Sequence, residues 1–122
     1  MSVIKLSALD VQFSKFIRLR DGLTCQRCKK QYVAGDRGLH CSHFIGRANH
    51  QTRFDPENCD ALCWGCHQYF ETHKASAYRD WKIEQLGQER FDALIERSRR
   101  IDKFDRDATR VRVLELVKSV AA

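Results

Sequence analysis

Two pairs of cysteines constrain the fold of this chain more than any other feature. Cys25 and Cys28 are separated by two residues, and so are Cys63 and Cys66. This spacing lets both thiolates of a pair bind one ion while the intervening backbone amides point toward the sulfurs, and two such pairs complete a tetrahedral zinc site. The sequence therefore predicts a structural zinc ion that joins the two segments. The alternative is four buried cysteines without a metal.

The expected location of the protein bears on the role of its two remaining cysteines, Cys41 and Cys59. The first residues contain no apolar core of a signal peptide, and no apolar run reaches the length of a membrane span, so we expect a cytoplasmic protein. In that reducing compartment, cysteines bind metals more often than they form disulfides. Cys59 could compete for the zinc ion and Cys41 could line an active-site pocket, but we expect both to be small buried residues.

The charge of the chain favours a polyanionic partner. The formal net charge is +6 and the sequence pI is about 9.2. Lysine and arginine gain affinity by displacing counterions from phosphates, although many basic proteins bind no nucleic acid. The 122 residues are enough for one small core, and nothing in the chain resembles a linker. We therefore expect a single domain over residues 1–122.

Hydrophobic spacing predicts an α+β fold that begins with an amphipathic helix. Apolar residues recur at helical spacing from Leu9 to Ile17, and Ser7 is a candidate N-cap. The segment between the cysteine pairs has strand character, and a proline at residue 56 ends the second expected strand. Up to residue 74 we expect a helix over 8–20, strands over 39–47 and 52–55, and a helix over 63–74.

The rest of the chain is expected to be helical. Helices are predicted over 77–87, 88–101 and 102–122. The second of these presents apolar residues on one side, namely Phe91, Leu94, Ile95 and Ile101. The third carries an apolar stripe made of Val111, Leu114, Val117 and Val120. We expect the stripe to pack in the core, and a dimer interface is the alternative.

Three short motifs in the central segment resemble the HNH, or ββα-metal, nuclease family. They are SHF (42–44), RFDPEN (53–58) and CWGCH (63–67), in which a histidine directly follows the second cysteine pair. Within that superfamily the chain is most similar to the phage recombination nucleases of the NinG type. The resemblance covers about residues 23–74 and implies a ββα-metal core stapled by zinc. Residues 75–122 would be a helical extension.

The resemblance implies a metal-dependent endonuclease that hydrolyses DNA phosphodiester bonds in a bacterial or phage-infected cell. Such hydrolysis needs an in-line water, a base for its proton and a positive centre for the developing charge. His43 matches the family's general base, and Asn58 matches the residue that ties down the loop between the strands. His67 matches the ligand of a divalent ion that bridges the phosphate and the leaving oxygen.

One position departs from the family's pattern. The residue before the base is usually an acidic or histidine ligand there, whereas here it is Ser42, a weak ligand. Glu71 or His73 could complete the coordination sphere, and Glu71 has the better spacing because residues four apart share a helix face. Mg²⁺, Mn²⁺ and Ni²⁺ are all admissible as the catalytic ion.

Basic residues flank the loop between the two expected strands. Arg47 and Arg53 could hold phosphates on either side of the cleaved bond. His50 lies in the same loop, which would face the substrate cleft, so it is a further candidate for nucleic-acid contact. His40 is expected to be a structural strand residue.

Three functions remain open on the sequence alone. The first is the DNA endonuclease. The second is a non-catalytic zinc module that binds nucleic acid, which the serine at residue 42 favours. The third is a redox protein that uses its Cys-x2-Cys pairs, but no thioredoxin-like βαβ pattern surrounds either pair, and the basic charge also argues against it.

Overall fold

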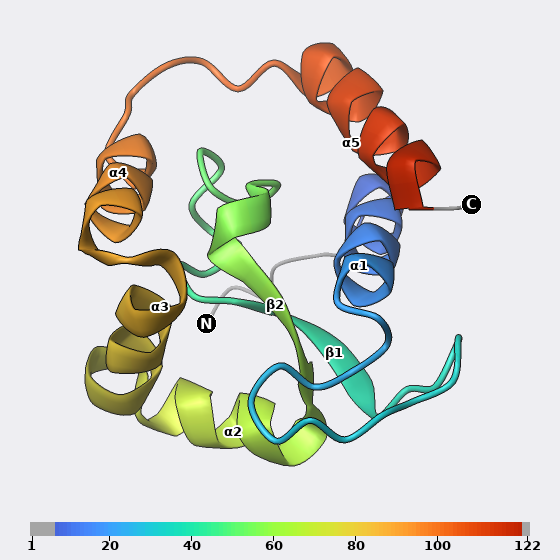
Figure 1. Cartoon of the computed structure of the whole chain (residues 1–122). Helices are drawn as coiled ribbons and strands as arrows, with labels where there is room; N and C mark the ends of the chain where they lie inside the picture. Colours follow the sequence, from blue (N-terminus) through green and yellow to red (C-terminus); the bar gives the residue numbers. More distant parts are fainter. Residues whose placement is uncertain (1–6, 121–122) are drawn as a thin grey trace.

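The computed structural model describes residues 7–120, which form an α+β fold. A two-stranded antiparallel hairpin lies at the centre, and helices surround it (Figure 1). The expected fold class is therefore confirmed. The helices of the described residues include none that is both long enough and apolar enough to cross a membrane.

The first helix, α1 (Ala8–Arg20), has the expected bounds and cap. Ser7 Oγ accepts a hydrogen bond from the backbone N–H of Asp10, and the Asp10 carboxylate accepts one from the Ser7 N–H. This reciprocal pair is a capping box, which satisfies two backbone donors at the start of the helix. After the helix, Gly22 has a φ of +64°, a conformation that glycine adopts without a steric penalty.

The hairpin consists of β1 (Leu39–His43) and β2 (Cys59–Cys63). The strands pair in antiparallel register from Leu39 opposite Cys63 to His43 opposite Cys59. The prediction of a strand over 52–55 is wrong, because these residues form turns and the return strand begins only at Cys59. The first strand is also shorter than expected, since it ends at His43.

Polar side chains hold the segment before β2 in turns. The Thr52 N–H and hydroxyl both donate to Asn49 Oδ1, and the Asp55 carboxylate accepts from the Glu57 N–H at the start of a 3-10 turn (Pro56–Asn58). Such local bonds offer the backbone an alternative to a β-ladder. The residues that do form β2, CDALC, include no β-branched side chain, so strand propensity gave no signal there.

Three helices lie on one side of the hairpin. α2 (Trp64–Thr72) follows β2 directly and continues through a π-helical turn (Lys74–Tyr78) into α3 (Arg79–Leu86), and α4 (Gln88–Ser98) comes next. Lys82 of α3 forms an ion pair with Asp60 of β2, with 2.7 Å between Nζ and Oδ2, and both side chains are buried. Removing either partner would leave a buried charge unpaired, so this contact fixes α3 against the hairpin.

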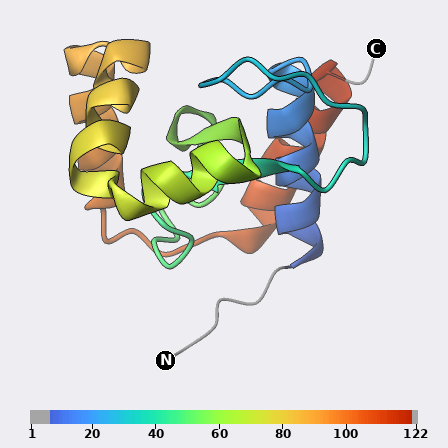
Figure 2. The ribbon, with the colours of Figure 1, turned by 90° about the horizontal axis from the view of Figure 1, so that it is seen from below.

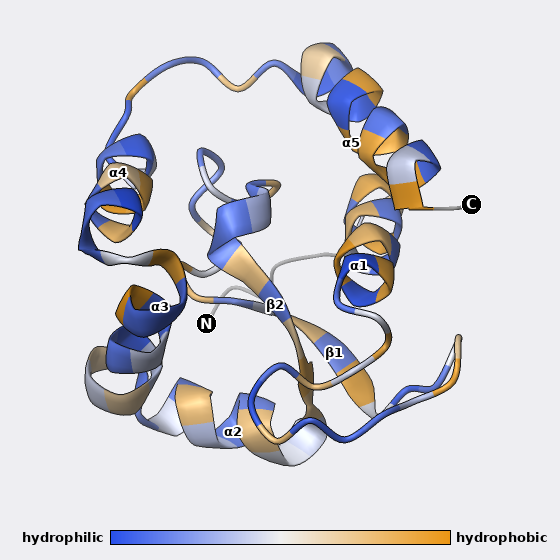
Figure 3. Cartoon of the chain, in the orientation of Figure 1, coloured by the Kyte–Doolittle hydropathy of each residue, from blue (hydrophilic) through white to orange (hydrophobic). Residues whose placement is uncertain are grey.

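The last helix, α5 (Arg106–Val120), returns to pack beside α1 (Figures 1 and 2). Val113 of α5 is fully buried in an apolar cluster with Phe13 and Ile17 of α1. Apolar residues alternate with polar ones along both helices, as expected for helices that bury one face (Figure 3). The protein therefore has one apolar cluster where α1 and α5 meet the hairpin and another where α2, α3 and α4 do.

Two expectations for the C-terminal helices are wrong in detail. Ile101 is 98% exposed, because α4 ends at Ser98 and residue 101 lies in the segment before α5. On α5, only the second half of the predicted stripe packs in the core: Val111 and Leu114 are exposed, whereas Val117 and Val120 pack against the cluster that contains the buried Val113. Helical residues three apart are rotated by about 60° short of a full turn at each step, so a stripe with that spacing does not stay on one face.

Candidate functional site

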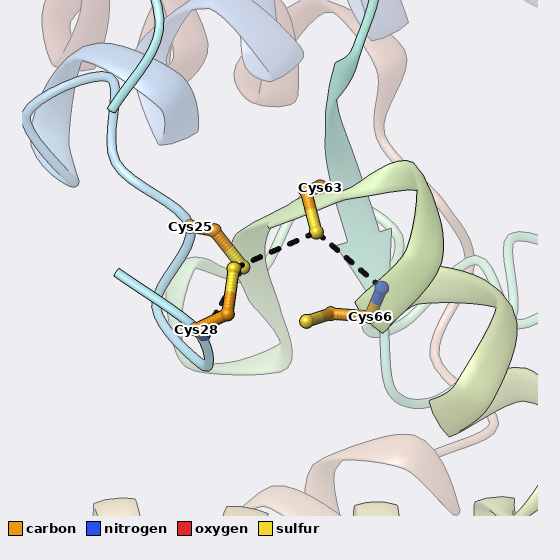
Figure 4. A group of neighbouring side chains, drawn as sticks. All are labelled: Cys25, Cys28, Cys63 and Cys66. Carbon is orange, nitrogen blue, oxygen red and sulfur yellow. Dashed lines mark hydrogen bonds between the residues drawn. The ribbon is translucent and has the colours of Figure 1, made fainter. Parts of the chain in front are cut away.

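The four cysteines of the two Cys-x2-Cys pairs meet at one point. Their sulfurs all lie within 4.8 Å of one another, with the first pair in the loop after α1 and the second at the start of α2 (Figure 4). The Cys28 and Cys63 sulfurs are 3.7 Å apart. Four sulfurs bound at about 2.3 Å to a tetrahedral zinc ion would be about 3.8 Å apart, so the cluster could hold a zinc ion.

Backbone amides point at the sulfurs of the cluster, as the spacing of the pairs predicted. The Cys28 N–H donates to Cys25 Sγ at 3.5 Å, and the Cys66 N–H donates to Cys63 Sγ at 3.4 Å (Figure 4). Burial raises the pKa of Cys25, but backbone hydrogen bonds outweigh it and lower the value to about 7. Arg27 adds a donor 3.5 Å from Cys66 Sγ. Burial nevertheless raises the pKa of Cys66 to about 12, so among these thiols the contacts favour the thiolate form that a metal binds at Cys25.

A second group of possible ligands forms where β1 meets α2. His40 Nδ1 lies 3.0 Å from His67 Nδ1. His40 Nε2 lies 3.1 Å from the Arg37 carbonyl oxygen, and because a carbonyl can only accept, that nitrogen carries the proton. His40 Nδ1 therefore presents a lone pair toward His67. The expectation that His40 is only a structural strand residue missed this contact.

The 3.0 Å contact is a hydrogen bond, in which His67 Nδ1–H donates to the lone pair of His40 Nδ1. A divalent ion with octahedral geometry could take the place of that proton, because two nitrogens bound at right angles and at about 2.1 Å would also be about 3.0 Å apart. Burial lowers the pKa of His67, which favours the neutral ring that can bind a metal. Glu71 Oε1 lies 3.8 Å from His67 Nε2, the ring nitrogen that does not face His40, so Glu71 adjoins His67 on the side away from His40. His73 instead packs on Tyr69 at the end of α2, with the ring centres 4.6 Å apart.

Ser42 is placed where it cannot readily act as a metal ligand. Its side chain is fully buried, and its hydroxyl is 2.7 Å from the hydroxyl of Tyr78. That hydrogen bond occupies the oxygen that a metal would need. The departure from the family's pattern at this residue therefore coincides with a structural hydrogen bond between β1 and the π-helical turn.

His43, at the end of β1, is buried with only 7% of its surface exposed. Its Nε2 lies 2.9 Å from the Arg53 carbonyl oxygen, so this nitrogen carries the proton and donates. Its Nδ1 is buried and has no hydrogen-bond partner among the described residues. Burial, with a smaller contribution from the charge of Arg47, lowers the pKa of His43 to about 4, so the ring is neutral at pH 7.

Asn58 closes the loop between the two strands. Its Oδ1 accepts from the Ile45 N–H at 2.8 Å, and its Nδ2 donates to the carbonyl oxygens of Ile45 and Thr52. Asn58 is fully buried, so each bond that it makes replaces one that water would otherwise supply. These contacts are the ones expected of a residue that ties down this loop.

Two arginines of the same loop have different surroundings. The Arg53 guanidinium pairs with Asp10 of α1, with 2.6 Å between Nη2 and Oδ2, and both side chains are largely buried. Its expected phosphate contact would require that pair to open. The charge of Arg47 contributes, after burial, to the lowered pKa of both His43 and His67. Arg47 Nε is buried without a hydrogen-bond partner among the described residues.

His50 is exposed beside a separate basic cavity. The cavity has a volume of about 370 Å³ and lies between the loop around residue 50 and the segment that joins α4 to α5. The His50 ring is 5.5 Å from that of Phe104. Cations from the second half of the chain also line the cavity, namely Arg97, Arg100, Lys103 and Arg112. The sequence did not identify these residues as a group, because they are spread over α4, α5 and the segment between them, and no motif links them.

Comparison with known proteins gives a family match over nearly the whole chain. The family model described as "Bacteriophage Lambda NinG protein" matches residues 6–120. No curated protein and no solved structure matches the chain. The match extends beyond the cysteine-bounded segment and includes the two helices α1 and α5 that pack together.

Proposed function

The chain belongs to the NinG family of bacteriophage proteins, and we propose that it is a metal-dependent endonuclease that cuts DNA during phage recombination. One observation carries the proposal more than any other. His40 and His67 come from different elements, yet their Nδ1 atoms are 3.0 Å apart, and a backbone carbonyl fixes the proton of His40 on its other nitrogen. Paired ring nitrogens with a carbonyl behind them are typical of a metal site.

In this proposal the ion is held by His40 and His67, with Glu71 beside them. A divalent ion there would bind the scissile phosphate and stabilise the charge that develops on it. Arg47 would neutralise the phosphate from the loop side, because its charge already acts on both His43 and His67. Mg²⁺, Mn²⁺ and Ni²⁺ are the candidate ions, and nitrogen ligands favour the last of these.

His43 is the proposed general base. Its low pKa, about 4, keeps the ring neutral, and the proton on Nε2 leaves the Nδ1 lone pair to accept a proton from water. Because Nδ1 is buried in the DNA-free chain, the loop that carries Arg47 and Arg53 must shift when DNA binds. Asn58 would limit that movement, since it holds both ends of the loop.

A plasmid-cleavage assay with EDTA and a series of divalent ions tests the proposal. His40→Ala and His67→Ala should each raise the metal concentration needed for half-maximal cleavage, whereas His73→Ala, an exposed histidine next to the end of α2, should not. His43→Ala should lower the cleavage rate by roughly 100-fold or more while DNA binding persists. A wild-type protein that cuts no supercoiled, linear, single-stranded or branched DNA with any of the ions would contradict the proposal.

A non-catalytic zinc module that binds nucleic acid is the second candidate. The burial of His43 and the Ser42–Tyr78 hydrogen bond favour it, because both remove groups that a nuclease would use. The basic cavity beside His50 would serve such a module equally well. DNA binding in a gel-shift assay without cleavage under any condition would support this function instead.

A further inference from the structure

A third set of metal-binding side chains lies inside the fold, away from the four-cysteine cluster. Cys41 and His43 of β1 and Cys59 of β2 offer two sulfurs and a ring nitrogen that all lie within 4.8 Å of one another. His43 is directly opposite Cys59 in the hairpin register, and Cys41 is two residues before His43 on the same strand. All three side chains are buried where α1 and α5 meet the hairpin.

The hydrogen bonds of His43 leave this group incomplete. Nε2 donates to the Arg53 carbonyl, and Nδ1 is buried with no partner among the described residues. A buried nitrogen lone pair without a donor costs free energy, and such groups are rare in native proteins. A histidine that donates one ring N–H to a backbone carbonyl has the proton placement of a metal ligand.

We propose that Cys41, His43 and Cys59 form a second metal site, which binds a thiolate-preferring divalent ion such as Zn²⁺. In a tetrahedral zinc site, sulfur and nitrogen ligands are separated by about 3.5–3.8 Å, so a small inward movement from the present spacing would close the site. The two thiols would release their protons to solvent as the two sulfur–metal bonds form. A protein ligand set of two cysteines and one histidine leaves the fourth position free.

The site has a consequence that rests on the proposed function. A metal bound to His43 occupies the nitrogen that would otherwise accept a proton from water. Zinc at this site would therefore inhibit the nuclease, while the ion at His40 and His67 remains in place. The two thiols would make the enzyme sensitive to zinc without taking part in cleavage.

The binding site is tested without any reference to cleavage. The His40→Ala/His67→Ala variant, which lacks the proposed catalytic-ion site, is the parent protein for the zinc counts; it is loaded with excess Zn²⁺, separated from free metal by gel filtration and analysed for zinc and by X-ray absorption. We expect two tightly held zinc ions per chain and a coordination shell that contains imidazole nitrogen as well as sulfur. One zinc ion per chain with a shell of sulfur alone would overturn the proposal.

A double variant, Cys41→Ala/Cys59→Ala, assigns the second ion. It should keep one zinc ion in an all-sulfur shell, because the four-cysteine cluster is unchanged. If the double variant folds poorly, His43→Asn gives the same comparison, because it should also lose the second equivalent of metal. Binding is then followed by titration with Co²⁺ and its visible absorption. Retention of two ions with mixed ligands in either variant would place the second site elsewhere and overturn the assignment.

The inhibitory role has its own measurement. With the catalytic ion saturating, the second zinc equivalent should lower wild-type cleavage by roughly 100-fold, the size of a general-base contribution. Cleavage by the Cys41→Ala/Cys59→Ala variant should change less than about twofold under the same conditions. Two bound zinc ions without inhibition would show that the site binds zinc but does not regulate cleavage. Absence of cleavage by the protein that carries only the zinc ion of the four-cysteine cluster, with any catalytic ion added, would instead count against the proposed function.

Discussion

His40 and His43 of β1 share one arrangement, in which a ring Nε2 faces a backbone carbonyl oxygen. The carbonyl can only accept, so it fixes the proton on Nε2 and leaves the lone pair on Nδ1. The lone pair of His40 points at His67, and that of His43 is buried beside two cysteines. The same strand therefore supplies two histidines whose Nδ1 lone pairs lie in different environments.

We predict that replacing Ser42 with the acidic residue that the family usually has there destabilises the fold. Ser42→Asp would place a carboxylate in a fully buried position and remove the hydrogen bond to Tyr78. We expect a loss of unfolding free energy on the order of 3 kcal/mol, because a buried charge would lack a partner. Denaturant unfolding measures this loss, and Ser42→Ala, which removes only the hydroxyl, is the matched control. A stability equal to that of the wild type would contradict the described surroundings of this residue.

Asp10 is predicted to stabilise the fold over a wide pH range. Burial raises its pKa, but the hydrogen bond to Arg53 and those to Ser7 outweigh burial and lower the value from 3.8 to about 2. A lowered carboxyl pKa stabilises the folded state above pH 3.8 and loses that contribution as the pH falls toward 2. The stabilisation amounts to about 2 kcal/mol.

The difference in unfolding free energy between the wild type and Asp10→Asn measures this contribution. It should stay constant from pH 8 to pH 5, because the Asp10 carboxylate is ionised in both the folded and the unfolded protein over that range. A difference that shrinks between pH 7 and pH 5 would indicate a titrating group other than Asp10.

At the scale of single residues, sequence patterns located the four cysteines that could hold a zinc ion but not the contact between His40 and His67. Cysteine spacing is a local property, so it can be read directly from the chain. The contact between His40 and His67 depends on the strand register, which places His40 opposite Leu62, just before α2 begins. Because the second strand was predicted at 52–55, its register with the first strand could not be derived. No short-range pattern in the sequence corrects that error.

At the scale of elements, the helices were easier to predict than the hairpin. The capping box and apolar spacing of α1 are local signals, and both are present in the structure. The loop before β2 is held instead by Asn49, Asp55 and Asn58, which bond to backbone groups several residues away. Such contacts favour a turn conformation in this loop over the strand that was predicted from its residues.

The orientation of α5 gives a prediction with an internal control. Val113→Ala should lower the free energy of unfolding by about 2 kcal/mol, because the side chain is fully buried against α1. Val111→Ala on the same helix should change it by less than about 0.5 kcal/mol, because Val111 is 58% exposed. Denaturant unfolding of both variants distinguishes the two faces. Equal effects would mean that the helix is rotated from the position described.

At the scale of the whole molecule, the four-cysteine cluster links the loop after α1 to the start of α2. We predict that removal of zinc by a strong chelator unfolds the protein, because metal binding and folding are coupled in sites of this type. Circular dichroism should show loss of helix, and added zinc should restore it. Cys25→Ser should aggregate or stay unfolded. A metal-free protein that keeps its helical spectrum and melting temperature would contradict this prediction.

The overall arrangement of the helices could be predicted only in part. The presence of the helices followed from the sequence, but the end of α4 and the buried face of α5 did not, and nothing local indicates that α5 packs on α1 rather than on α4. That pairing joins residues 8–20 to residues 106–120, and it depends on the matching of two apolar faces with the hairpin between them. A single sequence contains the least information about long-range packing of this kind.

The pairing of α1 with α5 also has a consequence for synthesis on the ribosome. α1 leaves the exit tunnel long before α5 is translated, since residues 21–105 separate them. Until then Phe13 and Ile17 lack the helix that covers them in the finished fold. Apolar surface exposed in this way is what chaperones bind and what promotes aggregation of nascent chains. A helix made late therefore shields one made early, and premature termination within α5 would release a chain with an exposed apolar surface that chaperones and proteases recognise.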